Sequence, residues 1–415
     1  MRKESMRLEL RPSKEMDSAA SNDVNEHNVV RLPNRARVYY NPSESWDKIY
    51  VVIKGAAQKK LRIRQAFKKD IASIIDRAKL DSVGFVTTKT YKSITQGKAA
   101  NNVWVSEDSE NVVIGCDPEF VLVGDDGVAI YADTIFRVEP KKEITDNISD
   151  GSKWARLGSD GPCAELRPDP SEDINVVIKN IKNLLTNNSS VIENFKWVGG
   201  ASFKHPTMER RYEIGGHIHL GRPADVKKEG HDLISCQHAV GRILDEMVGV
   251  PMIRFDTPLP AERRKAYGRF GDLKSDDVKL EWRVPSGIWL VHPTLSAAVM
   301  STTKAVAEEV WKRYKDRDLN DDFLLKKNVD DNIYKSFGCM NDETVRNTIN
   351  SSKITDVSDD RINDFYGRYK KMSTYHKYKD NIDLFIKLCM SKKHPLSDKF
   401  LELRNGWLNN KQLPL

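Results

Sequence analysis

Residues 112–123 read VVIGCDPEFVLV and are followed by the turn GDDG at 124–127 and by VAIYA at 128–132. Two strand-like runs on either side of a short glycine and aspartate turn predict a β-hairpin. Because side chains two residues apart on a strand share a face, Asp117 and Glu119 lie together on one side of the first strand. The apolar side chains of this strand lie on its opposite face, namely Ile114, Cys116, Phe120 and Leu122.

Three further short segments repeat this arrangement, each with two polar side chains that alternate with apolar ones. The segments are CAELRP at 163–168, EIGGHIHLG at 213–221 and KLEWRVP at 279–285. Their polar pairs are Glu165 with Arg167, His217 with His219, and Glu281 with Arg283. Any single pair is also explained by an ordinary strand with one face in solvent. Four such pairs in one chain favour a shared polar surface.

If the four strands are neighbours in one sheet, their common face carries four carboxylates, two imidazoles and two guanidinium groups. Carboxylates gathered on one concave surface need cations to offset their mutual repulsion. Hard divalent metal ions accept carboxylate oxygens, and a histidine can complete such a site. Arginine binds phosphate through two parallel hydrogen bonds. The combination predicts a metal-dependent site for phosphoryl transfer.

The chain lacks the signatures of several other enzyme classes. It contains no GxxxxGK[ST], GxGxxG or GxSxG motif, which excludes P-loop enzymes, protein kinases, standard Rossmann dinucleotide binding and a serine nucleophile elbow. Its five cysteines are far apart and form no CxxC pair, so we expect neither structural disulfides nor a zinc ribbon. No apolar run approaches the ~18 residues that span a bilayer, and no secretory signal is recognisable. We therefore expect a cytoplasmic protein without a membrane partner.

Composition divides the 415 residues into four regions, and interspersed hairpins and helices indicate the α+β class. Residues 1–34 are polar and weakly patterned, which predicts a flexible arm. Residues 35–105 form a small region in which apolar residues at helical spacing predict an amphipathic helix over about 57–79. Residues 110–315 are interpreted as the catalytic domain, and 316–415 as a mostly helical C-terminal region.

Positive charge is concentrated in the small N-terminal region. The chain has a net charge of +7, and residues 51–100 hold 12 Lys and Arg against three Asp. Much of this excess lies in 59–69, at Lys59, Lys60, Arg62, Arg64, Lys68 and Lys69. Such a segment could bind an acidic partner, including nucleic acid. A solvated face of the predicted helix is the more usual explanation of such a segment.

Five segments, in chain order, resemble the motifs of a known family: GCDPEF, AELRPDPSE, GGHIHLG, AERRKAYGRFGDLK and LEWRVPSGIWL. The family is that of the carboxylate–amine ligases (amidoligases) found mainly in bacteriophages, distant relatives of glutamine synthetase and glutamate–cysteine ligase. The resemblance extends from about Ile114 to about Val299. It implies a curved antiparallel sheet of the glutamine-synthetase type with flanking helices, here with a helical C-terminal extension, around a site for ATP and magnesium. A phage-encoded member would work in the host cytoplasm.

The resemblance also implies individual roles. The metal ligands would be Asp117, Glu119, Glu165, His217 and Glu281. The ATP phosphates would be bound by Arg167, His219, Arg269 and Arg283, and the last three would also stabilise the charge in transfer. Two positions depart from the family pattern: Asp117 stands where glutamine synthetase usually has glutamate, and Lys274 stands where an arginine is expected.

We therefore expect an ATP-dependent ligase that forms an amide or peptide-like bond through an acyl phosphate. Its substrates would be a small-molecule or peptide acid and an amine, neither of which the sequence identifies. One alternative is a metal-dependent zinc hydrolase, because the HxH pattern also occurs in zinc sites. Another is a non-catalytic interaction protein that retains the fold. A guanidine kinase, which shares the superfamily sheet, is a third.

Overall fold

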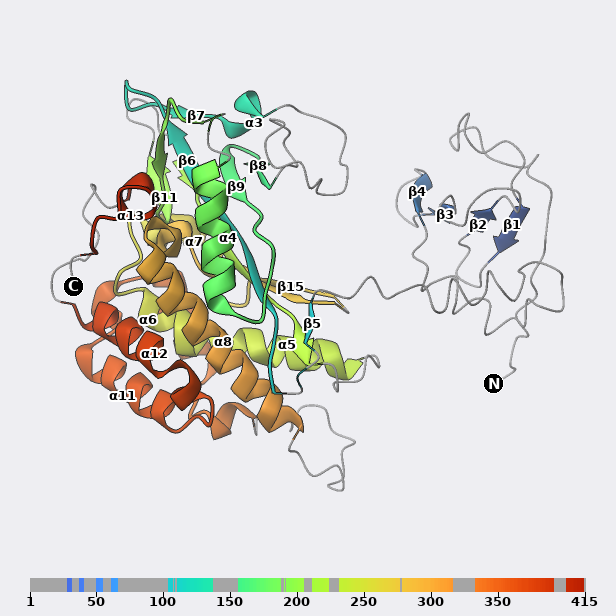
Figure 1. The fold of residues 1–415 in the computed structure, drawn as a ribbon. Coiled ribbons are helices and arrows are strands. Elements are labelled where there is room, and N and C mark those ends of the chain that lie inside the picture. Colours follow the sequence, from blue (N-terminus) through green and yellow to red (C-terminus); the bar gives the residue numbers. More distant parts are fainter. Residues whose placement is uncertain are drawn as a thin grey trace, which may run out of the picture. The chain divides into compact units, whose positions relative to one another are not determined.

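The computed structural model describes most of the chain after residue 103, together with four strands that precede it (Figure 1). The described residues after 103 are 104–136, 156–204, 211–223, 231–315, 333–391 and 401–413, apart from the single residues 107, 109, 188, 189, 191 and 277. The chain forms two compact units, Met1–Asn101 and Asn102–Leu415.

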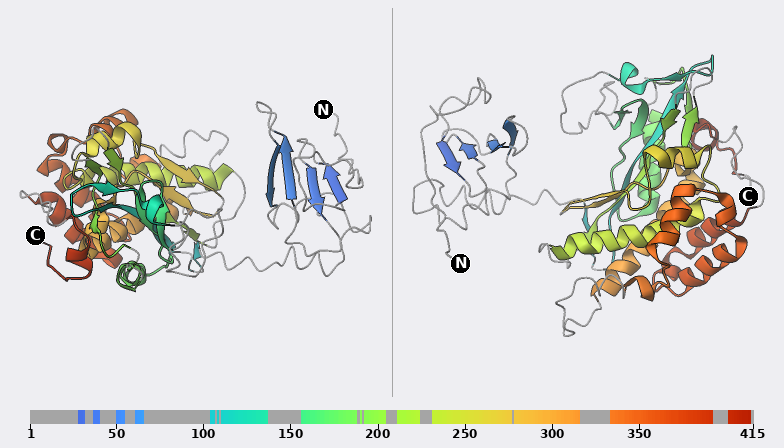
Figure 2. Two further views of the ribbon diagram at one scale, coloured as in Figure 1. Left: turned by 90° about the horizontal axis from the view of Figure 1, so that it is seen from above. Right: turned by 180° about the vertical axis from the view of Figure 1, so that it is seen from behind.

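The first unit contains a four-stranded antiparallel sheet in chain order, visible in the left view of Figure 2. Its strands are β1 (Asn28–Arg31), β2 (Arg37–Tyr40), β3 (Tyr50–Lys54) and β4 (Leu61–Gln65). β2 and β3 coincide with runs rich in valine, isoleucine and tyrosine, which favour strands.

The prediction of a helix over 57–79 is wrong for residues 61–65, which form β4. In this strand Leu61 and Ile63 alternate with Arg62 and Arg64, and such alternation is the period of a strand. The strand pairs along its whole length with β3, from Leu61 opposite Lys54 to Gln65 opposite Tyr50. The rest of 57–79 lies outside the described residues.

The prediction of a flexible arm over 1–34 is wrong for residues 28–31, which form β1. Val29 and Val30 pair there with Tyr39 and Val38 of β2. Residues of these types are common in strands. The remainder of the arm lies outside the described residues.

The second unit is built on one antiparallel sheet. In spatial order its main strands are β15 (Leu273–Ser275), β16 (Leu280–Trp282), β13 (Gly216–Leu220), β6 (Ile114–Val123), β9 (Cys163–Leu166) and β8 (Leu157–Asp160). β7 (Ala129–Ile130) and β10 (Lys196–Val198) pair with the C-terminal half of β6. The predicted hairpin of β6 and β7 is therefore confirmed. Two small ladders accompany the sheet: β11 (Ser202–Lys204) with β12 (Arg211–Glu213), and β5 (Val105–Ser106) with β14 (Arg222–Pro223).

Helices cover the apolar face of this sheet, where the predicted apolar residues of β6, β13 and β16 are buried. α4 (Ile174–Asn187), α5 (His231–Leu244) and α8 (Pro293–Lys315) pack against these strands. Trp282 of β16 and Ile218 of β13 are completely buried in this layer. The shorter helices are α3 (Ala132–Ile135), π-helix η5 (Asp245–Gly249), α6 (Val250–Met252), α7 (Pro260–Ala266) and 3₁₀ helix η6 (Gly287–Val291).

The C-terminal region is helical, as predicted, and belongs to the same compact unit. It contains α10 (Asp342–Ser351), 3₁₀ helix η7 (Ile354–Asp356), α11 (Asp359–Lys370), α12 (Tyr375–Met390) and α13 (Arg404–Trp407). α12 packs along α8, where Tyr378 donates to the buried carboxylate of Glu308 at 2.9 Å. The indole Nε1 of Trp407 donates to the backbone oxygen of Leu290 at 2.6 Å.

An antiparallel sheet with helices packed on it confirms the predicted α+β class. The finer expectation of a sheet like that of glutamine synthetase stays a prediction. Within the described part of the chain, no helix is both long and apolar enough to cross a membrane.

Candidate active site

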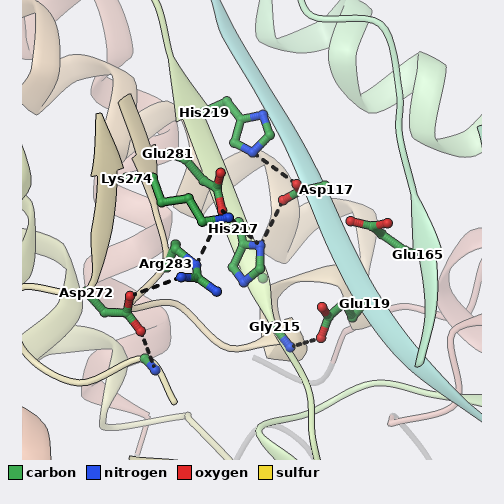
Figure 3. Close-up of polar contacts among 12 residues, drawn as sticks. Asp117, Glu119, Glu165, Gly215, His217, His219, Asp272, Lys274, Glu281 and Arg283 are labelled. Carbon is green, nitrogen blue, oxygen red and sulfur yellow. Dashed lines mark hydrogen bonds and ion pairs between the residues drawn. The ribbon is translucent and has the colours of Figure 1, made fainter. Parts of the chain in front are cut away.

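The four strands that carry the predicted polar pairs are neighbours, in the order β16, β13, β6 and β9. In the register of the sheet, His217 lies opposite Asp117 and His219 lies opposite Glu281. Figure 3 shows these side chains converging on one another. The condition on which the sequence argument depended is therefore met.

Asp117 lies at the centre of the group, between the two imidazoles. Its Oδ1 is 3.0 Å from Nδ1 of His217, and its Oδ2 is 3.1 Å from Nε2 of His219. Burial raises the pKa of Asp117, but the charges and hydrogen atoms of the two imidazoles outweigh it and hold the pKa well below its usual range. The carboxylate is therefore ionised over the whole physiological pH range.

The close approaches around Asp117 leave polar atoms without a hydrogen bond. Oδ1 of Asp117 and Nε2 of His219 are both buried and lack a hydrogen-bond partner. One ligand atom each from Asp117, His219 and Glu281 can be chosen so that all three lie within 4.8 Å of one another. Buried polar atoms without partners are costly, and two carboxylates beside an imidazole suit a divalent cation. The carboxylates of Asp117 and Glu281 thus fit a metal ion, and the imidazole nearest to them is that of His219, where the resemblance implied His217 as a ligand.

Tyr267 determines which nitrogen of His217 carries hydrogen. Its hydroxyl lies 2.5 Å from Nε2 of His217, and it accepts hydrogen bonds from Nε and Nη2 of Arg283 at 2.9 and 2.5 Å. Because a guanidinium only donates, the single phenol hydrogen is directed to Nε2. A neutral His217 then carries its hydrogen on Nδ1, on the side of Asp117. Burial and the nearby carboxylate of Glu119 raise the pKa of Tyr267, so the phenol keeps this hydrogen.

Lys279 has the corresponding effect on His219. Its ammonium group donates to Nδ1 of His219 at 2.8 Å, since an ammonium offers no acceptor. A neutral His219 therefore carries its hydrogen on Nε2, which makes this nitrogen a donor while the contact persists. Burial lowers the pKa of Lys279, and the carboxylates of Asp117 and Glu281 partly oppose this effect.

Glu119 and Glu165 lie opposite one another on β6 and β9. Oε2 of Glu119 accepts a hydrogen bond from the backbone nitrogen of Gly215 at 2.6 Å, and burial raises the pKa of this carboxyl group. Glu165 forms an ion pair with Arg167, whose guanidinium also donates to the backbone oxygen of Ser159 at 3.2 Å. A side chain at Gly215 would meet both Glu119 and the ring of the neighbouring histidine, so only glycine fits there.

A second group of charges surrounds Glu281 (Figure 3). Nε of Arg283 is 3.3 Å from Oε1 of Glu281, and Nη1 of Arg283 is 3.5 Å from Oδ1 of Asp272. Lys274, which replaces the expected arginine, reaches Oε1 of Glu281 at 3.4 Å. The lysine thus supplies a positive charge beside the candidate cation ligand.

Arg269 does not join this group. Its Nε donates to the backbone oxygen of Arg264 at 2.8 Å, and its Nη2 donates to that of Lys265. Both oxygens belong to the end of α7, where carbonyl groups lack helical partners. The exposed Arg269 therefore satisfies the C-terminus of a helix in this structure.

Arg263 joins the segment before β13 to the segment after β16. It is completely buried and donates to the backbone oxygens of Ile214, Arg283, Val284 and Pro285 at 2.9–3.2 Å. Burial and the adjacent Arg264 lower the pKa of Arg263 to about 10. The guanidinium stays charged and fixes the segments that precede His217 and follow Glu281.

Sequence reasoning missed three of these residues, namely Tyr267, Lys279 and Arg263. The sequence does indicate a place for Lys279, because Lys279, Glu281 and Arg283 follow one another at a spacing of two residues and so share a face of the strand. Tyr267 and Arg263 lie within the motif AERRKAYGRFGDLK, but nothing in that stretch indicates which strand each side chain meets.

The family description "Phage phiEco32-like COOH.NH2 ligase-type 2" matches the chain over residues 114–407. The chain belongs to this family. The expected relationship to phage-type carboxylate–amine ligases is thus confirmed, and the family's description is that of a ligase joining a carboxyl and an amino group. No curated protein matches the chain.

The limits of the match agree with the structure of the second unit. The matched segment begins at Ile114, the first residue of β6, and ends at Trp407, the last residue of α13. It therefore includes every strand of the candidate active site and the C-terminal helices, which the sequence resemblance did not cover. The four-stranded sheet of the first unit lies outside the match.

Proposed function

We propose that this protein is an ATP-dependent ligase that joins a carboxylate to an amine through an acyl phosphate, at a magnesium site on the face of the central sheet. Membership of the ligase family supports the overall reaction. The arrangement of Asp117, His219 and Glu281, with Arg283 beside them, is the observation that supports phosphoryl transfer.

Asp117 and Glu281 are the carboxylates best placed to hold the cation, because their oxygens approach each other and Oδ1 of Asp117 has no hydrogen bond. Glu119, Glu165 and His217, the other ligands implied by the family resemblance, line the adjoining part of the face. A bound magnesium ion would neutralise charge on the phosphate oxygens during transfer. Magnesium commonly retains several waters and needs few protein carboxylates, which fits this set.

Cationic and hydrogen-donating side chains of the protein would bind the phosphate group that is transferred. Arg283 presents a guanidinium beside Glu281, and its orientation is fixed by Tyr267. His219 offers an Nε2 hydrogen on the other side of Asp117 because Lys279 occupies Nδ1. Both groups would stabilise charge that develops on the phosphate when the substrate carboxylate attacks it. The amine would then displace phosphate from the activated acid. Arg269 takes no part in this scheme, because it is bound to the end of α7.

A zinc hydrolase receives less support. Such a site usually needs three protein ligands rich in nitrogen. Within the described residues, only His217 and His219 lie in the group, and His238 of α5 is exposed beside Ser275, 3.4 Å from its Oγ. Their second nitrogens are already engaged by Tyr267 and Lys279.

Hydroxylamine tests the proposal, because this small nucleophile can replace an unknown amine. The purified full chain would be incubated with ATP, magnesium, hydroxylamine and a panel of amino acids, peptides, polyamines and cell-wall fragments. We expect at least one acid to give a hydroxamate together with ADP and phosphate. Formation of AMP and pyrophosphate would indicate an adenylating enzyme and contradict the proposal. Hydrolysis of an amide with zinc and without ATP would favour the hydrolase.

A further inference from the structure

A cavity of about 350 Å³ lies where β6 and the chain after β9 separate. The two segments pair at Glu119–Glu165 and meet again through two backbone hydrogen bonds between Ile114 and Ser171. Between these points, four residues of β6 face the five residues 166–170. The segment 166–170 contains Pro168 and Pro170, which cannot donate a backbone hydrogen bond. The unequal lengths and the prolines prevent pairing and leave an opening beside Asp117.

Trp104 forms one wall of this cavity and is held there by two glycines. A Cβ atom at Gly115 would lie 2.5 Å from Cη2 of the indole, so the ring rests directly on the strand. A Cβ atom at Gly221 would collide with the backbone oxygen of Trp104. That oxygen also accepts from the nitrogen of Arg222 at 2.9 Å. The indole and Pro168 and Pro170 therefore give the cavity a fixed apolar side.

The polar side of the cavity contains one cation without a carboxylate partner. Arg167 is paired with Glu165, and Arg156 is paired with Asp169 at 2.5 Å. Among the described residues, no carboxylate lies within ion-pair distance of the half-buried Lys279. Its Nζ contacts Nδ1 of His219 and lies 4.9 Å from the centre of the Trp104 ring. Asp117 and Glu281 act on Lys279 only from beyond contact distance. A half-buried cation with no carboxylate in contact is unfavourable, so an anionic ligand is the expected complement.

His219 borders the same cavity. His219 is only 6% exposed and lines the cavity, and its Nε2 has no hydrogen-bond partner. With Lys279 on Nδ1, this nitrogen is a donor, but it lies 3.1 Å from Oδ2 of Asp117, so its hydrogen is on the side of that carboxylate. The cavity therefore offers an anion the charge of Lys279.

We propose that this cavity binds the acid substrate as a small carboxylic acid, with its carboxylate at Lys279 and its body against Trp104, Pro168 and Pro170. This inference rests on the proposed ligase function. The volume is at the lower end of the ~300–1,000 Å³ of ligand pockets, which suits a small acid better than a nucleotide.

The order of residues on β16 supports the same assignment. Lys279 and Arg283 lie on either side of Glu281 at a spacing of two residues. The attacking carboxylate and the terminal phosphate must come within ~3–3.5 Å of each other. If Arg283 binds phosphate at one end of this row, the acid enters from the other end, where the cavity opens beside Asp117.

Replacement of Lys279 tests the inference in two assays. Lys279→Met keeps the length of the side chain and removes its charge, Lys279→Gln is a second neutral variant, and Lys279→Arg restores the charge. The matched control is Lys379→Met, at an exposed lysine of α12 that pairs with Asp383. Calorimetry would measure the binding of acetate, hexanoate, phenylacetate and glutamate, and the hydroxamate assay would give KM for the acid and for ATP.

We expect both neutral variants to raise Kd and KM for the acid by roughly 10- to 100-fold, as for a lost hydrogen bond to a charged group. KM for ATP should change less than about threefold, and Lys279→Arg should recover much of the loss. Trp104→Ala should weaken hexanoate and phenylacetate more than acetate. The control variant should match the wild type.

Other results would overturn the inference. An increase in KM for ATP without a change for the acid would make the cavity a nucleotide subsite. Hydroxamate formation with unchanged KM for the acid would reject the cavity but leave the ligase function standing. If wild-type protein binds none of the acids, the inference fails. Acid binding that depends on Lys279 in a protein that never turns over ATP would support the cavity and reject the ligase proposal.

Discussion

Asp245 accepts a hydrogen bond from the indole Nε1 of Trp282 at 2.7 Å, on the face of β16 opposite Glu281 and Arg283. Its other oxygen accepts from the backbone nitrogen of Gly271 at 2.7 Å. Gly271 precedes Asp272, which is an ion-pair partner of Arg283. A single buried carboxylate in η5 therefore supports both the strand and the loop of the candidate active site from behind.

Asp245 should make the stability of the protein depend on pH. Burial raises the pKa of Asp245 to about 7, because desolvation outweighs the hydrogen bonds from Trp282 and Gly271. A folded-state pKa above the unfolded value means that the folded protein holds the proton more tightly. This contribution is fully present below about pH 4 and is lost as pH rises through about 7. In urea titrations we expect the free energy of unfolding to fall between about pH 4 and 7, by at most about 4 kcal/mol.

Asp245→Asn should remove this slope, whereas Asp360→Asn, at an exposed position of α11, should retain it. The asparagine variant should also be less stable at pH 5 by roughly 1–3 kcal/mol, because its amide cannot accept from both donors. Identical slopes in the two variants would show that Asp245 is not the titrating group.

Tyr267→Phe should lower kcat/KM by roughly 10- to 100-fold with little loss of fold. The change removes the hydroxyl that orients Arg283 and donates to Nε2 of His217, while the ring and its packing remain. Nitrogen-15 spectra should show a shifted resonance for Nε2 of His217, which loses its hydrogen-bond donor, while the Asp117 carboxylate still favours hydrogen on Nδ1. Tyr366→Phe, which removes a hydroxyl bound to Asp383 on the surface of α11 and α12, is the control. An unchanged Nε2 resonance in Tyr267→Phe would contradict the positioning role.

The face of the sheet could be predicted from sequence because it depends on a local rule. The alternation in GCDPEF, GHIHL and LEWR places Asp117, His219 and Glu281 on polar faces whatever the strand order. This rule does not predict that the strands are neighbours in the sheet, which only the occurrence of four polar pairs in one chain favoured. The same rule predicts β4 from the alternation of Leu61 and Ile63 with arginines. The apolar spacing over the longer range 57–79 predicts a helix instead, and the pairing of β4 with β3 shows that this prediction is wrong for residues 61–65.

The contacts that orient these side chains could not be predicted, because they join segments that are distant in sequence. Arg263 meets the carbonyl of Ile214, 49 residues away, and Tyr267 meets His217, 50 residues away. The direction of Arg269 depends on the loop between Gly268 and Gly271, both of which have positive φ angles, 66° and 77°. The motif therefore locates Arg269 in the sequence but does not predict where its side chain points.

Arg269→Ala should leave turnover within about threefold of the wild type. Its guanidinium binds carbonyl oxygens of Arg264 and Lys265, and loss of such an interaction at an exposed helix end costs roughly 0.3–1 kcal/mol. The measurement is kcat and KM for ATP in the hydroxamate assay, with a thermal melt to record the small loss of stability. A fall in turnover of 100-fold or more would mean that Arg269 moves to the phosphates on binding, as the family resemblance implied.

Glu281→Gln and Arg283→Ala should each damage the same step. Magnesium should raise the melting temperature of the wild type by mass action if it binds there. Glu281→Gln removes a candidate cation ligand while keeping the shape of the side chain, so this rise should be lost. Arg283→Ala should lower turnover by roughly 10³-fold if this arginine acts as a phosphate clamp. Glu343→Gln, at an exposed position of α10, is the control for both measurements.

The double variant Glu281→Gln with Arg283→Ala should be little worse than the more damaging single variant. Nε of Arg283 and Oε1 of Glu281 are 3.3 Å apart, so both residues would act on one transition state, and the losses of such residues do not add. Additive losses would indicate that the cation and the guanidinium serve separate steps. Normal turnover in Glu281→Gln, with magnesium still raising the melting temperature, would remove Glu281 from the cation site and with it the main support for phosphoryl transfer on this face.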